Sequence, residues 1–563
     1  MVLPAPEKMF GALSAVATGR PARISVVPHS ARANAPAILM RASQPTIAGS
    51  GVCESHSMPD DACKLLRRAL ESDDVSTVEG LVREHPETLN PTTGLPPLSA
   101  ARSLPMAERL LSLGADVKIV GQWWASGFET RKVDKTVAKF LVERGAGLTA
   151  HAAAGLGLVE RLAEMLDADT LLIDSKGGDG CTPLHFSRNA EVARLLLARG
   201  ARIDARDEDH DSTPAQWLIG DVPEVTRLLL QRGATADIFM AAALGDRALA
   251  ETLIAANRGC LGFRIGKGHE FPPIGYKGRG GTIYQWTLAF NSYPHQIALA
   301  KGHQALFAYL FENSDTTTQF LVSCVLARRS EAESVLAFNP SLVASLPSED
   351  LELLARYCWE TNLNYDAVKL MLDVGFPVAH PETSHGYTPL HNAAWAGHSR
   401  LVDLLLRHGH PVDILDPCYK ATPLGFALHD CLVEKRHPEA EFARVIGSLL
   451  DAGSPWNALC YPTGNASLDE IFKAKLHLRP EGAALLGDES QVFLLLAQDS
   501  SPETLARALA GAAKGGHASL CQRIIAAGAR VNDAVDHDQN TALKYALESG
   551  SAETIALLER HAA

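Results

Sequence analysis

The stretch GYTPLHNAAWAGHSRLVDLLLRHGHPVDI, residues 386–414, carries the pattern that decides the fold. Thr388 stands where it can cap a helix, and Pro389 suits the first helical position, where its missing N–H is not needed. The leucines of LVDLLL at 401–406 recur three and four apart, which indicates a helix with one apolar stripe. Gly409 can end that helix in the left-handed conformation. The stretch therefore predicts two short helices and a turn.

The same pattern recurs along the chain at a regular spacing. Gly200 and Gly233 close two similar apolar helices, and Gly375 and Gly409 close two more at nearly the same separation. A pair of short helices cannot bury its stripe alone, so neighbouring copies must stack. Thr-Pro openings like that at Thr388 also stand at three other positions, Thr182, Thr213 and Thr422.

The period and the Thr-Pro-Leu-His opening resemble those of the ankyrin-repeat family. The resemblance covers most of 60–563: it is strong over 180–236 and 386–455 and weak over 60–178, 316–376 and 460–500. Phrases such as HDSTPAQWL and ATPLGFALH are similar to those of large bacterial members of the family. The resemblance implies an all-α solenoid that binds a partner protein, here with roughly 12–14 helix-turn-helix units.

Composition narrows the classes of partner. The chain of 563 residues has 52 Lys and Arg against 65 Asp and Glu, a net charge of −13. That balance disfavours binding to DNA or to an anionic membrane surface through charge alone. No uninterrupted apolar stretch is long enough to span a bilayer. Ten scattered cysteines without a C-x-x-C pair favour reduced thiols and a cytoplasmic location.

The segment 1–57 differs from the rest of the chain. It is rich in Ala, Pro and Ser and poor in acidic side chains, which is typical of disorder or of a targeting leader. Three interpretations stay open: translation starting at Met58, a disordered tail, or a leader for export. Beyond this segment we expect an N-terminal repeat array over 58–257, an insertion over 258–286, and a C-terminal array over 287–563 that ends in a polar-faced cap.

The insertion is Gly-rich, basic and aromatic. Such a loop could cradle a phosphate or stack a base, because backbone N–H groups converge where side chains are missing. Its glycine spacing fits neither a Walker loop nor a dinucleotide fingerprint. The alternative is a structural excursion that covers the solenoid. The candidate binding residues here are Lys267, Tyr276, Lys277, Arg279 and Trp286.

A second candidate is the acidic run DARDEDHD at 204–211. It is interpreted either as an acidic finger tip for a basic partner or as a solvated turn. The glycine and terminal glutamate of a helix-loop-helix calcium site are absent, so no metal site is expected. The candidate contacts are Arg206, Asp207, Glu208, Asp209 and His210.

Tryptophans supply a third group, since Trp dominates interface hot spots. Trp217 and Trp395 follow helix openings and are either partner anchors or inter-repeat core, the core being the preferred interpretation. Trp123 and Trp124 lie in a segment, 118–135, that interrupts the repeat pattern and that we expect to be an irregular insertion. Two adjacent tryptophans cannot easily share one helix stripe, so we expect at least one to be exposed or to pack across the loop.

Tyr419 and Lys420, in the turn before Thr422, complete the candidate contacts. No catalytic motif is present, so no catalytic residue, cofactor or metal is expected. The sequence therefore predicts a non-catalytic scaffold that binds a protein through its concave face, fingers and insertions. Two alternatives remain: an effector exported through residues 1–57 that grips a host protein, and a nucleotide- or phosphate-binding module at 258–286.

Overall fold

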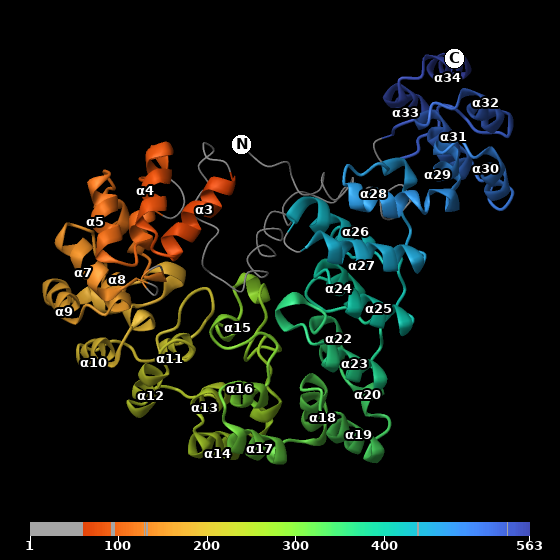
Figure 1. Ribbon diagram of the computed structural model, residues 1–563. Coiled ribbons are helices and arrows are strands. Elements are labelled where there is room, and N and C mark those ends of the chain that lie inside the picture. Colours follow the sequence, from red (N-terminus) through yellow and green to blue (C-terminus); the bar gives the residue numbers. More distant parts are fainter. Residues whose placement is uncertain are drawn as a thin grey trace. The chain divides into compact units, whose positions relative to one another are not determined.

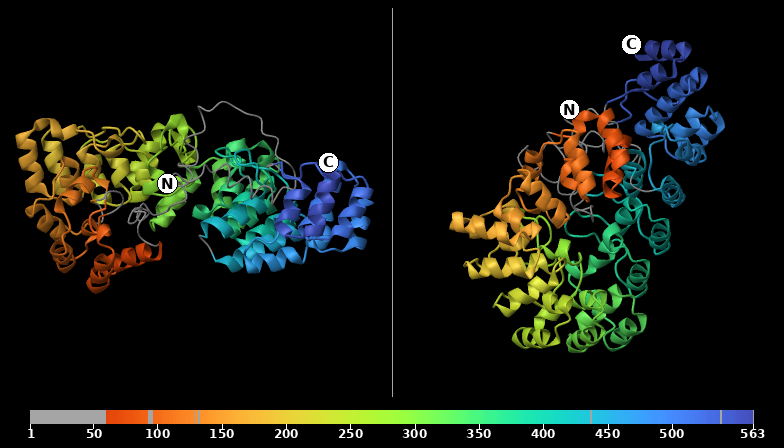
Figure 2. Two further views of the ribbon diagram at one scale, coloured as in Figure 1. Left: turned by 90° about the horizontal axis from the view of Figure 1, so that it is seen from above. Right: turned by 60° about the vertical axis from the view of Figure 1, so that its left-hand side comes forward.

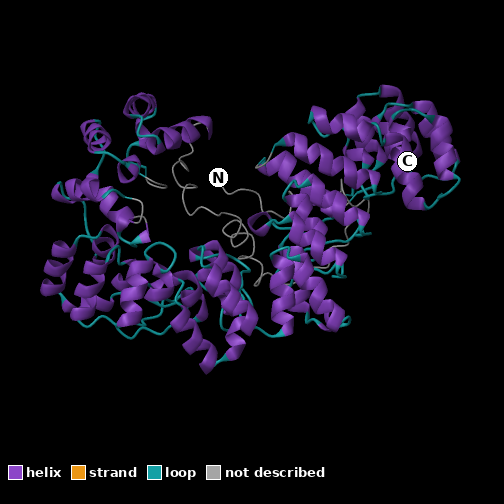
Figure 3. Cartoon of the chain, turned by 60° about the horizontal axis from the view of Figure 1, so that its bottom comes forward, coloured by secondary structure: helices purple, strands orange, loops and turns teal. Residues whose placement is uncertain are grey.

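The computed structural model describes residues 60–91, 96–128, 130, 133–435, 438–536 and 539–562. The expectations for residues 1–57 lie outside these ranges. Throughout the described ranges the chain folds into helices joined by turns and loops, and its one strand-like feature is an isolated bridge between Lys267 and Phe271 (Figure 3). The all-α solenoid expected from the repeats is confirmed.

The described residues form two compact units that meet in sequence at Val322 and Ser323. We call residues 60–322 the N-terminal unit and residues 323–562 the C-terminal unit. Each consists of consecutive helix pairs, which can be followed in Figures 1 and 2. None of the helices described is both long and apolar enough to cross a membrane.

In the N-terminal unit most repeats are pairs of α-helices. These pairs are α3 (Asp60–Glu71) with α4 (Val75–Glu84), α6 (Val117–Trp124) with α7 (Lys135–Glu143), α8 (Ala150–Leu156) with α9 (Val159–Ala168), α11 (Pro214–Leu218) with α12 (Pro223–Gln231), α13 (Ile238–Leu244) with α14 (Arg247–Ala256), and α16 (Pro294–Ala300) with α17 (Gln304–Asn313).

Two repeats of this unit open with a 3-10 helix instead of an α-helix. They are η2 (Pro97–Ala100) with α5 (Leu104–Ser112) and η6 (Pro183–Phe186) with α10 (Ala190–Ala198). The connections carry α15 (Tyr284–Thr287) and the 3-10 turns η1 (Pro86–Thr88), η4 (Thr170–Asp174), η5 (Gly178–Gly180), η7 (Arg258–Gly262) and η8 (Tyr276–Gly278).

Helix α18 (Thr316–Val325) crosses the division and is followed by α19 (Arg329–Phe338). The pairs of the C-terminal unit are α22 (Leu353–Arg356) with α23 (Tyr365–Asp373), α24 (Pro389–Trp395) with α25 (Ser399–Arg407), α26 (Pro423–His429) with α27 (Glu439–Asp451), α29 (Pro480–Leu485) with α30 (Glu489–Leu496), α31 (Pro502–Lys514) with α32 (Ala518–Ala526), and α33 (Ala542–Ser549) with α34 (Ala552–Ala562).

Short elements connect these pairs. They are α20 (Leu342–Ser345), α21 (Ser348–Leu351), η9 (Glu360–Asn362), the short π-helix η10 (Asp430–Glu434), η11 (Ala458–Cys460), α28 (Ala466–Lys473) and η12 (Leu476–Leu478). Within the described ranges the helix pairs number fifteen, thirteen of two α-helices and two that open with a 3-10 helix, one more than the expected 12–14. Pairs also form over 316–376 and 460–500, where the sequence pattern is weak.

Successive repeats stack in two layers. First helices contact first helices, as α24 contacts α26, and second helices contact second helices, as α25 contacts α27. The leucine stripe faces inward: Leu401, Leu404 and Leu405 are buried. Because burying each such side chain contributes about 1.5–3 kcal/mol, the stacking of neighbours holds the array together.

The helix openings take the form that the sequence predicts. Thr388 caps α24, and His391 returns the bond: its Nδ1 accepts from the Thr388 backbone N–H at 3.4 Å. The other ring nitrogen, Nε2, donates to the Ala421 carbonyl at 3.1 Å, which ties α24 to the next repeat. His185 does the same between Thr182 and the Ser212 carbonyl. These histidines are therefore structural.

Candidate functional site

Three turns between repeats share one hydrogen-bonded form, and we call them fingers: residues 207–212, 382–387 and 416–421. In each, the backbone N–H of the first residue donates to the carbonyl of the sixth. The fifth residue has a positive φ: 50° at Asp211, 76° at Gly386 and 56° at Lys420. Lys420, a candidate contact from the sequence, lies at this position, and the structure shows that its backbone also closes the finger.

A buried carboxylate holds each finger closed. Asp207 accepts the backbone N–H groups of His210 and Ser212, the latter at 2.9 Å. Asp416 accepts those of Cys418, Tyr419 and Ala421 at 2.7–2.8 Å. A buried acceptor is needed here because orphaned backbone donors are costly.

Glu382 plays this part in the third finger, with a different electrostatic balance. It accepts the backbone N–H groups of Ser384 and His385. Burial opposes its ionisation, but the bond to His385 and the charges of His385 and Arg356 lower its pKa to about 2. For Asp416, burial outweighs its backbone donors and raises the pKa. The finger acids are therefore structural acceptors.

This corrects the interpretation of Asp207 as part of an exposed acidic tip: it is 3% exposed. Trp217 is also internal, at 4% exposed, and its indole N–H donates to the Asp207 carboxylate at 3.0 Å. The core interpretation of Trp217 is confirmed, and it is not available as a partner anchor. Arg206 and Glu208 stay exposed, and Arg206 donates to the Asp211 carbonyl.

The tryptophan pair of the N-terminal unit is also corrected. Trp123 and Trp124 do not lie in an irregular insertion but end helix α6. Trp124 is fully buried, and Trp123 is partly buried against the same apolar core. The helix forms because Asp116 caps it by accepting from the Lys118 N–H.

The 258–286 segment packs onto the finger 207–212. The Gly280 N–H donates to both the Asp209 backbone carbonyl and its carboxylate, each at 3.0 Å. His210 Nδ1 donates to the Gly281 carbonyl at 2.9 Å. A Cβ at residue 280 would lie 2.5 Å from a carboxylate oxygen of Asp209, so the close approach favours glycine here. The excursion that covers the solenoid is the interpretation that the structure supports.

The cations of this segment contact different groups. Arg264 is buried and donates to Asn291 at 3.2 Å, Arg258 donates to the Asn313 carbonyl, and Arg279 lies 3.7 Å from Asp211. Lys277 lies over the Tyr276 ring at 5.2 Å. These contacts distribute the positive charge along the segment, an arrangement that does not favour a phosphate cradle. Lys267, Tyr276 and Trp286 are partly exposed.

The C-terminal unit presents an aromatic surface, which we call the aromatic face. Tyr387 and Phe426 form its buried base, and Trp359, Trp395 and Tyr419 pack on them while staying partly exposed. The core interpretation therefore holds only in part for Trp395. The aromatic face joins first helices and two fingers, because Tyr387 and Tyr419 each lie in a finger.

Thiol chemistry finds little support. Burial raises the pKa of Cys260 and Cys431 to about 11 and that of Cys521 to about 12. Cys418 is the most exposed of them, but the partial desolvation of its thiol and the charge of Asp416 raise its pKa as well. Because the thiolate is the nucleophile, these thiols are poorly suited to covalent catalysis. Among the described residues, the cysteines form no disulfide.

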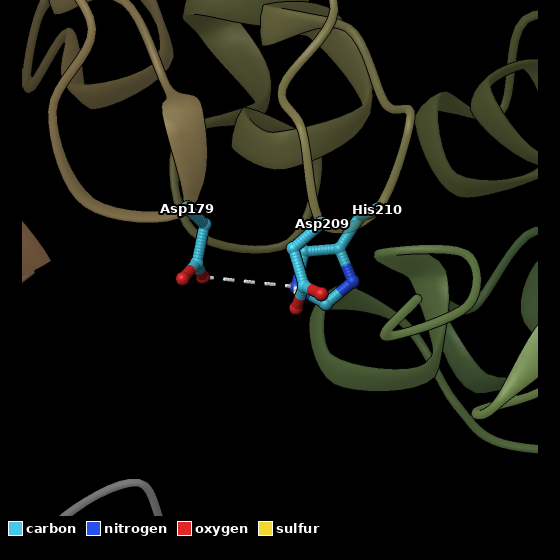
Figure 4. Close-up of side chains that lie close together, drawn as sticks. All are labelled: Asp179, Asp209 and His210. Carbon is cyan, nitrogen blue, oxygen red and sulfur yellow. Dashed lines mark ion pairs between the residues drawn. The ribbon is translucent and has the colours of Figure 1, made fainter. Parts of the chain in front are cut away.

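One group of side chains has the spacing of metal ligands. Asp179, in the turn at 177–181, lies beside Asp209 and His210 of the next finger (Figure 4). One ligand atom from each lies within 4.8 Å of the others. No local motif in the sequence indicates this group, because Asp179 belongs to the turn one repeat before Asp209.

Two family models match the chain. A model of an ankyrin repeat matches residues 179–208, and a model of ankyrin repeats in many copies matches residues 371–427. The first match lies in the N-terminal unit and the second in the C-terminal unit. No curated protein matches the chain. With the Thr-Pro cap, the leucine stripe and the closing glycine present in both units, each unit contains ankyrin repeats.

Proposed function

We propose that this protein is a non-catalytic scaffold that binds a partner protein through the aromatic face of its C-terminal unit. Ankyrin repeats are, in general, protein–protein interaction modules. The observation that carries the proposal is that Trp359, Trp395 and Tyr419 are all partly exposed on one cluster. Trp and Tyr are the residues that most often dominate binding energy at protein interfaces.

The aromatic face is held in place before any partner arrives. Trp395 stacks on His429 with ring centroids 5.7 Å apart and an angle of 10° between the planes. It also meets Phe426 edge-on at 5.8 Å. Rings fixed in this way lose little conformational freedom on binding, which favours affinity.

The fingers add a second part of the surface. Asp416 fixes the backbone at Tyr419, and the neighbouring Leu415 and Lys420 are exposed. Together they offer an apolar centre with a charged rim, the usual organisation of an interface. The partner that fits is a protein segment that inserts apolar side chains between the aromatic rings.

The test is a selection of peptides from a displayed random library against the full chain, followed by affinity measurement with fluorescent synthetic peptides. We expect selected peptides to carry apolar anchors and to lose at least about tenfold in affinity to Trp395→Ala and to Tyr419→Ala. Phe338→Ala is the matched control, since Phe338 is an exposed aromatic residue of the second helix α19, outside the aromatic face.

The control variant should bind as the unaltered chain does. Equal affinity of all four proteins would place binding elsewhere and overturn the assignment of the aromatic face. Failure to select any peptide or protein ligand would count against the scaffold itself. Circular dichroism of each variant establishes that it is folded before its affinity is compared.

A further inference from the structure

The group Asp179, Asp209 and His210 is built by two turns that are pinned together. The backbone N–H of Glu208 donates to the Asp179 carbonyl at 2.8 Å, and the N–H of Asp209 points to the same oxygen at 3.3 Å. Asp179 has a φ of 54°, a left-handed conformation that Asp adopts more readily than most residues. The backbone therefore holds the Asp179 carboxylate beside the next finger.

His210 is the most informative member. Its side chain is 8% exposed, and its Nδ1 contacts the Gly281 carbonyl at 2.9 Å. Because a carbonyl only accepts, Nδ1 carries a hydrogen, and Nε2 is the ring nitrogen that faces the carboxylates. Nε2 makes no hydrogen bond to them: it lies 3.5 Å from Asp209 Oδ2 and 3.9 Å from Asp179 Oδ2.

Nε2 and the two carboxylate oxygens converge on one point, where a bound cation would offset the negative charge of the carboxylates. The three atoms are spaced as ligands of one ion would be. Zn²⁺ binds nitrogen and oxygen at about 2.0–2.1 Å in a tetrahedron, which puts neighbouring ligand atoms about 3.3 Å apart. The separations of Nε2 from the two carboxylate oxygens, 3.5 and 3.9 Å, are slightly wider, and all three ligand atoms lie within 4.8 Å of one another.

The surroundings also suit a metal centre. A metal-binding histidine usually donates its other ring N–H to a carbonyl or carboxylate, the role that Gly281 has here. Asp209 is oriented in the same way by the Gly280 N–H. The carboxylates of Asp179 and Asp209 are 40% and 45% exposed, which gives an ion a path to the site.

We propose that Asp179, Asp209 and His210 bind a divalent transition-metal ion, for which Zn²⁺ is the best fit, with water completing the coordination. One imidazole nitrogen with two carboxylate oxygens suits Zn²⁺ better than Ca²⁺, which prefers six to eight oxygens. The ion would join two consecutive turns to the 258–286 segment through His210 and Asp209. This role is separate from partner binding by the C-terminal unit.

The test is titration of the metal-stripped full chain with Zn²⁺, under a reducing agent that does not bind metal, against a competing chromophoric chelator. We compare the unaltered chain with Asp179→Asn, which removes one anionic ligand but tolerates the left-handed conformation. The matched control is Asp211→Asn. Asp211 is also exposed, has a φ of 50°, and lies in the same finger outside the metal group.

We expect the unaltered chain to bind one equivalent of Zn²⁺. Asp179→Asn should bind it at least about tenfold more weakly than the unaltered chain, and Asp211→Asn should bind it as tightly as the unaltered chain. Equal binding by the unaltered chain and Asp179→Asn, or no such equivalent, overturns the proposal. If Asp179→Asn is not folded by circular dichroism, Asp209→Asn replaces it. The absorption spectrum of the Co²⁺-loaded chain provides an independent readout. Nitrogen and oxygen ligands give visible bands without a thiolate charge-transfer band. A thiolate band that persists in Asp179→Asn would show that cysteines bind the metal instead and would overturn the assignment.

Discussion

The fingers 207–212 and 416–421 have the same backbone conformation, but the rest of the chain covers the tip of the first and leaves the tip of the second partly exposed. Both begin with a buried aspartate that accepts N–H groups of the turn, and both place a residue of positive φ fifth. In the first, the 258–286 segment covers His210 and Asp209. In the second, Tyr419 packs on the base of the aromatic face and stays partly exposed.

The difference shows that the repeat determines the backbone conformation of the finger, while the rest of the chain determines what the residues at its tip contact. A turn whose backbone N–H groups are satisfied by its own buried carboxylate does not depend on the side chains at its tip, so those residues can vary. In the N-terminal unit they contact the chain itself. In the C-terminal unit they contribute to a surface that we assign to a partner.

The largest effect is expected in the helices, where the two units should not differ. Leu229 in α12 and Leu405 in α25 occupy the same position of the leucine stripe and are both fully buried. Leu229→Ala and Leu405→Ala should each lower the free energy of unfolding by about 2–5 kcal/mol, measured by urea denaturation. A small effect at only one of them would show that the repeats of that unit are not packed as described.

A second prediction concerns acid sensitivity, which both units should share. Burial lowers the pKa of His185 and of His391 to about 4, against about 6.5 in an unfolded chain. Between those values the unfolded chain binds more protons. The free energy of unfolding therefore keeps its full value above pH 6.5 and falls as the pH drops towards 4. At pH 5 the loss is on the order of 2 kcal/mol per histidine.

Glutamine is the matched replacement, because Gln216 closes the equivalent capping box of α11 without titrating. His185→Gln and His391→Gln should retain the stability at pH 7.5 and lose less of it at pH 5, measured by urea denaturation at both pH values. His269→Gln, at an exposed position, is the control and should follow the unaltered chain. If His391→Gln is as acid-sensitive as the control, the buried imidazole is not the cause.

The smallest expected effects on stability come from substitutions at the positive-φ residue of two fingers of the C-terminal unit. Gly386→Ala should destabilise by about 1–2 kcal/mol, because its methyl group would be strained and would lie 2.5 Å from Pro417. Lys420→Gly should change stability by less than about 0.5 kcal/mol, since relief of strain offsets the entropy that glycine gains on unfolding. Thermal unfolding midpoints rank the two, and equal midpoints would contradict the comparison.

The candidate contacts show how far sequence reasoning reached. Tyr419 stays a predicted contact, and the sequence left the 258–286 segment open between a phosphate-binding loop and a structural excursion, of which its contacts with Asp209 and His210 support the excursion. For Trp217, only its burial and its hydrogen bond to Asp207 distinguish the core interpretation from that of a partner anchor. Asp179 was missed, because its partners are in the next repeat and no local motif joins them.

The sequence by itself determined the helices and caps of the clear repeats, since these depend on contacts within about one repeat: the Thr-Pro cap, the leucines three and four apart, and the closing glycine. It did not predict helix α6, which lacks this pattern. Only the tertiary structure decided which tips are covered and which side chains meet. The meeting of His210 with Gly281 joins residues 71 positions apart, and that of Asp179 with Asp209 joins two turns. Such contacts depend on the path of the chain between repeats, which leaves no periodic signal in the residues that it brings together.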